Sequence, residues 1–220
     1  SLVSMLGPCD QVISVNAHHD IGLVAECARR ARGTVLVFTE AHCLPDPDFL
    51  LACDRVLAEN PGWAGFSGEP EPVVHNLLSE VEADMYVRHI RSNLRSHPWL
   101  KVLDQCFVVE RTAYEASGGL EAEFGHFAEH ILAARLHRSG ATIGFDSRPA
   151  MTTRYVGVIG ELVAFARDFG AGEVKFAVGA DVDPCGDLLR PPDVWRRRLE
   201  TDPKVARRMV QLLVADLVSA

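Results

Sequence analysis

The spacing of apolar residues predicts short strands and helices that follow one another closely. Residues 11–15 alternate like a strand, and residues 21–32 show helical spacing behind Asp20, a residue type that favours a helix N-cap. Gly33 is a natural helix stop. Residues 34–39 form a continuous apolar run, which is typical of a strand buried on both faces. This order indicates an α/β fold with a mostly parallel sheet flanked by helices.

Similar patterns continue along most of the chain. Further helices are expected at residues 46–59, 77–95, 111–117, 127–139 and 160–169, and further strands at 63–67, 105–109 and 142–145. Residues 181–192 are rich in proline, glycine and aspartate and predict a linker. Residues 194–220 predict one or two helices. We therefore expect a core domain over residues 1–180, and a linker with a C-terminal helical arm over 181–220.

Composition narrows the class of protein. Hydrophobic residues make up 48% of the 220 residues, so the chain can bury a core. The formal net charge is -8 without a long basic run, which argues against nucleic-acid binding. The six cysteines include no Cys-x-x-Cys pair, and we interpret them as reduced thiols. No apolar stretch approaches the roughly 20 residues that span a bilayer, and the N-terminal residues do not resemble a signal peptide. We expect a cytoplasmic protein, with the inner face of a membrane as an alternative location.

The first candidate site follows the apolar run at residues 34–39. In open parallel sheets, ligands bind beyond the carboxyl ends of the strands, and Glu40 and His42 follow such an end directly. A carboxylate and an imidazole are competent ligands for a divalent ion such as Mn²⁺. Such an ion neutralises a diphosphate leaving group. The alternative interpretation is a surface turn that caps a helix.

The second candidate site is the segment from His126 to His130. Glu129, near a predicted helix start, could serve as a general base if its neighbours tune its pKa. The segment also fits the pattern H-x-x-E-H of one class of zinc peptidases, in which both histidines bind zinc and Glu129 is the base. A solvated first helical turn is the third interpretation.

The predicted arm carries a possible interaction surface. Arg207 and Arg208 are followed by apolar residues at helical spacing up to Val218. Such a segment can pack on its own domain, join two copies of the chain, or contact a membrane surface peripherally.

Several segments, in this order, resemble the family 2 glycosyltransferases. The matching positions are Gly22, Ala31-Arg32-Gly33, residues 35–50, Arg111, Gly118-Gly119, Glu123-Phe124, Glu129, Leu132, Arg135-Leu136 and Gly140. The resemblance covers about residues 11–180, and the order and separation of the pieces make it specific. It implies a GT-A-like (Rossmann-like) domain that transfers a sugar from a nucleotide-sugar donor to an acceptor hydroxyl, with inversion at the anomeric carbon.

The resemblance also implies roles for individual residues. Glu40 and His42 occupy the outer positions of an Asp-x-Asp motif that would hold a divalent metal, Mn or Mg, and the donor diphosphate. Glu129 falls at the catalytic Asp and would deprotonate the acceptor. Gly118 and Gly119 would let the backbone approach the sugars, and Arg154, where the family usually has a late His, would contact phosphate.

The chain also departs from the family pattern. The metal motif reads Glu-Ala-His, and Ala128 replaces the acid that usually precedes the base. The first nucleotide-binding strand and helix of the family have no counterpart before Gln11, so we expect an N-terminally incomplete or degenerate member. A non-catalytic binding module is therefore an alternative function. The sequence does not distinguish a sugar, a lipid or a protein as the acceptor.

Overall fold

The computed structural model describes residues 6–8, 10–15, 20–89, 94, 96–103, 105–155, 157–179 and 183–189. Helices and strands are interspersed along these residues, as predicted for an α/β protein. The helices are α1 (Asp20–Arg30), α2 (Phe49–Glu59), α3 (Leu77–His89), η3 (Pro98–Leu100), α4 (Arg111–Ala116), η4 (Ala122–Phe127), α5 (Ala128–Arg138) and α6 (Ile159–Gly179). The strands are β1 (Val35–Phe38), β2 (Cys43–Pro45), β3 (Gly65–Ser67), β4 (Glu71–Val73), β5 (Phe107–Glu110), β6 (Ile143–Phe145) and β7 (Met151–Arg154).

The strands form two mixed sheets. The larger has the order β1-β5-β3-β6, and the smaller has the order β2-β7-β4. In the larger sheet β5 runs antiparallel to β1 and β3, and only β3 and β6 pair in parallel. Strands β1, β3 and β6 therefore share one direction and β5 opposes them, so the expected mostly parallel sheet is not confirmed.

The reversal of β5 follows from where the chain returns to the sheet. A parallel neighbour needs a crossover that carries the chain back to the start of the previous strand. Here β5 begins beside the end of β3, where Ser67 pairs with Phe107. The Gly68 N–H donates to the Cys106 carbonyl at 2.8 Å and fixes this junction.

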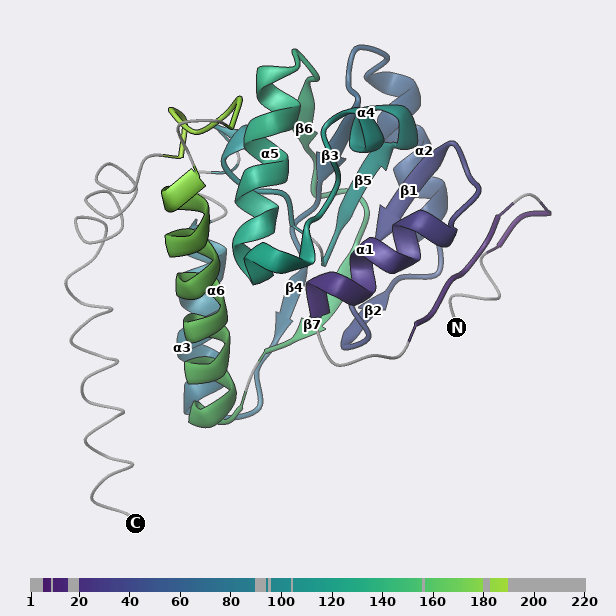
Figure 1. Ribbon diagram of the computed structural model, residues 1–220. Helices are drawn as coiled ribbons and strands as arrows, with labels where there is room; N and C mark the ends of the chain where they lie inside the picture. Colours follow the sequence, from purple (N-terminus) through teal and green to yellow (C-terminus); the bar gives the residue numbers. More distant parts are fainter. Residues whose placement is uncertain are drawn as a thin grey trace, which may run out of the picture.

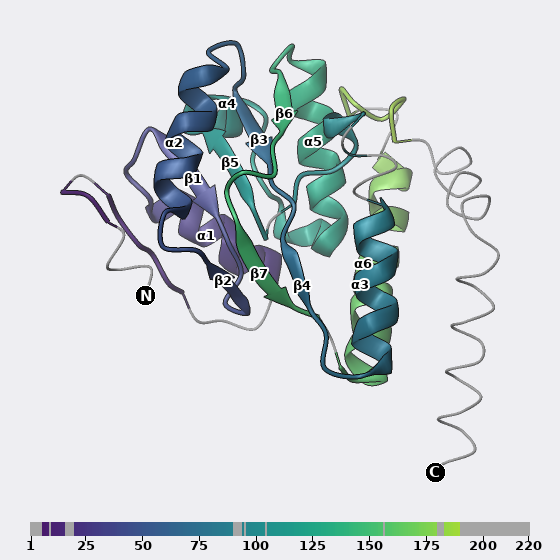
Figure 2. The ribbon, with the colours of Figure 1, turned by 180° about the vertical axis from the view of Figure 1, so that it is seen from behind.

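Helices cover both faces of the larger sheet (Figures 1 and 2). On one face, residues of α1, α4 and α5 pack against β1, β5 and β6 around Leu36, Phe107 and Leu132. On the other, Phe49 and Val56 of α2 pack against β3 and β5. Helices α3 and α6 lie on the same side of the molecule as the end of the smaller sheet, with α6 in front of α3 in Figure 1 and behind it in Figure 2.

Strand β1 departs from its predicted burial. Leu36 and Phe38 are buried, but Val35 and Val37 are 37% and 36% exposed, so the expected burial on both faces is wrong. Among the described residues, β1 pairs with β5 alone and is an edge strand. Residues 11–15 do not form the expected strand. They pass alongside α1 instead, where the Cys27 thiol donates to the Ile13 carbonyl.

The end of the described chain also differs from the prediction. Helix α6 extends ten residues beyond the expected end at residue 169. Residues 183–189, predicted as part of a linker, pack on the core, because Cys185 and Leu189 join Phe127 and Phe176 in one apolar cluster. The predicted arm at 194–220 lies outside the described residues. No described helix has both the length and the apolar character needed to cross a membrane.

Candidate functional site

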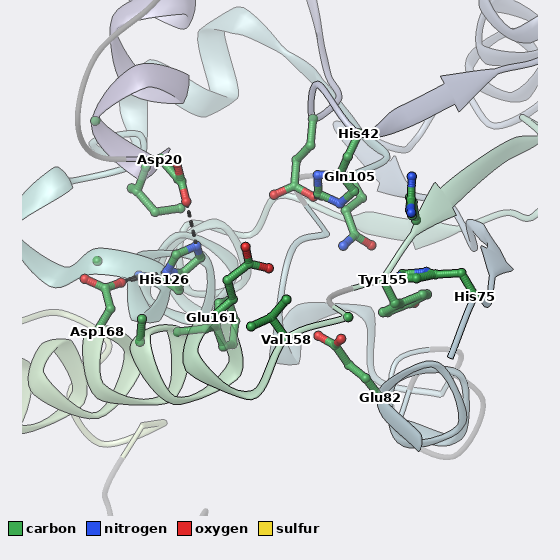
Figure 3. A pocket seen from close by; sticks show the side chains of 18 of the residues that line it. Asp20, His42, His75, Glu82, Gln105, His126, Tyr155, Val158, Glu161 and Asp168 are labelled. Atoms are coloured by element: carbon green, nitrogen blue, oxygen red, sulfur yellow. Dashed lines mark hydrogen bonds and ion pairs between the residues drawn. The ribbon is translucent and has the colours of Figure 1, made fainter. Parts of the chain in front are cut away.

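A cavity of about 880 Å³ opens between α1, η4, α6 and the segments that follow β1 and β7 (Figure 3). Its described lining is rich in ionisable side chains. They are the carboxylates of Asp20, Glu40, Glu82, Glu161 and Asp168, the imidazoles of His42, His75 and His126, and the guanidinium of Arg154. Five carboxylates against one guanidinium give the cavity an acidic character.

Glu40 and His42 lie together at one side of this cavity. They belong to the turn that links β1 to β2, and His42 Nε2 lies 3.1 Å from Glu40 Oε2. The Cys43 thiol completes a group of three possible ligand atoms, all within 4.8 Å of one another. The thiol also lies 2.6 Å from the Thr153 hydroxyl. A carboxylate and an imidazole suit Mn²⁺, whereas a cysteine sulfur suits softer ions. This donor set therefore fits a divalent ion, although the cluster alone does not show that one binds.

Arg154, which is distant from Glu40 and His42 in the sequence, lines the same cavity. It is the last residue of β7, which pairs with β2 through Cys43 and Thr153. The Arg154 N–H donates to the His42 carbonyl at 3.4 Å, so the two segments are joined beside the candidate metal ligands. The structure thus brings together the three residues that the sequence assigned to a donor diphosphate.

Tyr155 lines this side of the cavity, with its hydroxyl oxygen buried. Its ring packs edge-on against Tyr86 at 5.7 Å between centroids. Burial, together with the nearby Glu82 carboxylate, raises the pKa of Tyr155 well above its usual value. The phenol therefore stays protonated at neutral pH, and its oxygen is buried without a hydrogen-bond partner among the described residues.

A second cluster lies across the cavity from His42 (Figure 3). His126 Nδ1 is 2.7 Å from Asp168 Oδ2, and the backbone N–H of His126 donates to the same oxygen at 2.9 Å. His126 Nε2 is 3.9 Å from Asp20 Oδ2. The sequence patterns predicted His126 only as a possible zinc ligand and Asp20 only as a helix cap. Asp168 carried no signal, because it lies on α6 and meets His126 only in the folded chain.

Glu129 lies outside the cavity. Its side chain is 1% exposed and forms an ion pair with Lys101, with 2.7 Å between Oε2 and Nζ. It belongs to the first turn of α5, which faces the interior. A general base must reach the proton that it removes. The predicted role of Glu129 as the base is therefore corrected: its carboxylate is sealed in the core rather than turned toward Glu40 and His42.

Gly118 and Gly119 also lie outside the cavity lining. They form the turn that ends α4, with φ angles of 83° and 65° that side chains rarely adopt. A Cβ at Gly119 would lie 2.8 Å from the Tyr114 ring, whose hydroxyl accepts the Leu120 N–H. The two glycines therefore shape this turn, and their predicted contact with the donor stays a prediction.

The peptidase pattern does not assemble a metal site. His130 Nδ1–H donates to the Leu100 carbonyl at 2.7 Å, and the His130 ring stacks on Phe127. Within the described part of the chain, the only group of three or more possible metal ligands is Glu40, His42 and Cys43. The hypothesis of a zinc peptidase is therefore not supported.

Comparisons with known proteins add no assignment. Neither the family models nor the curated proteins searched show a match to this sequence.

Proposed function

We propose that this chain is a glycosyltransferase of the family 2 type, which moves a sugar from a nucleotide-sugar donor to an acceptor hydroxyl. One observation carries the proposal. Glu40, His42 and Arg154, assigned to the donor site from separate parts of the sequence, line one cavity. Cavities of roughly 300–1,000 Å³ are typical of small-molecule sites, and the cavity of about 880 Å³ lies within that range.

The charge of the cavity supports a dependence on metal. Five carboxylates face one guanidinium there, so a donor diphosphate would be repelled unless a cation accompanied it. Glu40 and His42 would hold that cation, Mn²⁺ or Mg²⁺, which when bound neutralises the charge of the leaving diphosphate. Arg154 would contact the same phosphates, because a guanidinium binds their oxygens in pairs.

The remaining polar groups suit a sugar. The carboxylates of Glu82 and Glu161 can accept hydrogen bonds from sugar hydroxyls. Val158 and Phe165 add an apolar wall. Most ligand sites combine a few polar groups with apolar surface in this way.

Calorimetry with nucleoside diphosphates tests the donor site. Uridine and guanosine diphosphate are titrated into the whole chain with Mn²⁺ and again with excess chelator. We expect metal-dependent binding that weakens about tenfold or more in His42→Ala and in Arg154→Ala, since each loses a charge-assisted contact. His97→Ala and Arg32→Ala are matched exposed controls and should bind like the native chain. Undiminished binding in chelator would defeat the metal site, and no binding of any nucleotide would defeat the donor site.

A non-catalytic binding module is the second candidate function. The burial of Glu129 favours it, because the base expected from the sequence does not reach the cavity. Turnover separates the two functions. A transferase slowly releases nucleoside diphosphate from a bound nucleotide-sugar, with water as the acceptor, whereas a binding module returns the donor intact. Nuclear magnetic resonance of the released sugar also reports whether the anomeric configuration is inverted.

A further inference from the structure

The imidazole of His126 is held with a defined proton. Asp168 Oδ2 accepts both the His126 backbone N–H and Nδ1, at 2.9 and 2.7 Å. A carboxylate can only accept in such a pair, so Nδ1 carries the hydrogen of the neutral ring. The lone pair of Nε2 is thereby left available, which is the form that a general base requires.

The local backbone is adapted to this contact. Gly125 has a φ of 48°, in the region that favours glycine. A Cβ at this position would lie 2.3 Å from Asp168 Oδ2, so any other residue would displace the carboxylate. The Phe165 ring packs against the imidazole with 4.4 Å between centroids. The ring of His126 is therefore oriented by the residue before it and by two side chains of α6.

Carboxylates from two helices surround the imidazole of His126. Asp168 of α6 faces Nδ1, Asp20 of α1 lies 3.9 Å from Nε2, and Glu161 of α6 lines the same cavity. His126 also lies across the cavity from His42, so one bound ligand can span both (Figure 3).

We propose that His126 is the catalytic base of the sugar transfer and that Asp168 is its positioning residue; this inference rests on the function proposed above. Nε2 takes the proton of the acceptor hydroxyl. The oxygen's electron pair forms the new bond to the anomeric carbon. The bond between that carbon and the diphosphate oxygen breaks, and its electron pair leaves with the nucleoside diphosphate. The imidazolium then releases its proton to solvent.

Other groups in the cavity fit this role less well. Glu40 lies beside His42 at the candidate metal site. Glu129 is sealed against Lys101. Among the described lining residues, His126 combines an accessible nitrogen with a carboxylate that orients it, the arrangement by which an acidic residue holds a catalytic histidine.

Kinetics of the whole chain with Mn²⁺ and a nucleotide-sugar test the proposal. We expect His126→Gln to lower kcat by about 10²–10⁴-fold, the usual share of a general base. Asp168→Asn should lower kcat by roughly 10–100-fold with the donor KM unchanged, because the amide can still hold the ring but lacks the charge that stabilises the imidazolium formed in the reaction. Imidazole added to His126→Gly should restore turnover, which a purely structural role would not permit. His137→Gln, an exposed histidine of α5, is the matched control.

Calorimetry with nucleoside diphosphate separates this inference from the proposed function. If His126→Gln keeps both the native Kd and the native kcat, the base assignment is overturned and the transferase proposal stands. If the native chain binds nucleotide without turnover, the binding module is favoured and the base assignment is overturned with the transferase. If the native chain binds no nucleotide, both proposals fail. Thermal unfolding checks that each variant folds. If a variant is less stable, restoration of turnover by imidazole in His126→Gly still tests whether His126 is the base.

Discussion

His126 and Glu129 lie three positions apart in the sequence, and each pairs with an ionisable side chain, but the two pairs have different roles. His126 pairs with Asp168 and Glu129 pairs with Lys101, both at 2.7 Å. The side chains of the first pair are 13% and 42% exposed, whereas those of the second are 9% and 1% exposed, with Glu129 the more buried. Distance alone therefore does not distinguish them. Access decides which pair can exchange a proton with a ligand and which can only hold helices together.

The break at Gly125 accounts for the difference. The residue has non-helical φ and ψ angles within η4, so the chain changes direction before His126. His126 then faces α6 and the cavity. Glu129 lies one turn later on α5, which packs against η3 and Lys101 just after it. A continuous helix through this segment would have fixed the relative directions of the two side chains differently.

Loss of the buried pair should have the largest effect on stability. Glu129→Gln leaves the Lys101 ammonium, 9% exposed, without its carboxylate in the core. Breaking such a pair costs about 3–5 kcal/mol of unfolding free energy. Urea denaturation of the native chain and the variant measures this difference.

A double variant sharpens the same test. Replacing both partners, as in Lys101→Met with Glu129→Leu, removes the charge as well as its counter-charge, so most of the lost stability should return. A loss below about 1 kcal/mol for Glu129→Gln, the size typical of exposed pairs, would mean that Glu129 is open to solvent. The contrast between the two pairs would then collapse, and Glu129 would again be a candidate base.

A third pair on α5 should show an intermediate effect that depends on pH. Asp183 accepts hydrogen bonds from Arg135 Nε and Nη2 at 3.2 and 2.6 Å. Burial alone would raise the pKa of Asp183, but the hydrogen bonds from Arg135 and Cys185 outweigh it and hold the pKa below its usual value. Asp183→Asn should cost roughly 1–3 kcal/mol at pH 7, as for hydrogen bonds to charged groups.

The sign of the pH dependence follows from the lowered pKa. The contribution of Asp183 is complete above the unfolded pKa of about 3.9 and is lost as the pH falls through the lower folded value. Denaturation at pH 7 and at about pH 3 should therefore show the native chain and Asp183→Asn converging in acid. A difference that is equal at both pH values would show that the charge of Asp183 does not carry the effect.

The sequence located the candidate metal ligands of the cavity better than the proposed base. Glu40 and His42 follow the end of β1, a local feature that the pattern of apolar residues reveals. Arg154 is the last residue of β7. The partner of His126 could not be foreseen, because Asp168 meets it only through the packing of α6 on η4. Glu129 was misassigned because helical spacing does not say which face of α5 is covered. The direction of β5 was missed because it depends on where the chain re-enters the sheet.

The smallest expected effect concerns the stability of the open pair. Asp168→Asn removes a charge that is 42% exposed, and the amide oxygen can still accept from the His126 backbone and ring. Exposed ion pairs contribute about 0–1 kcal/mol, so urea denaturation should place this variant within about 1 kcal/mol of the native chain. The two variants should then differ in what they lose. Glu129→Gln should lose stability, because it leaves a buried charge unpaired, whereas Asp168→Asn should lose turnover and keep its stability. A loss of several kcal/mol of unfolding free energy in Asp168→Asn would show that the pair of His126 and Asp168 mainly holds α6 in place. Solvent exposure would then no longer distinguish this pair from that of Glu129 and Lys101.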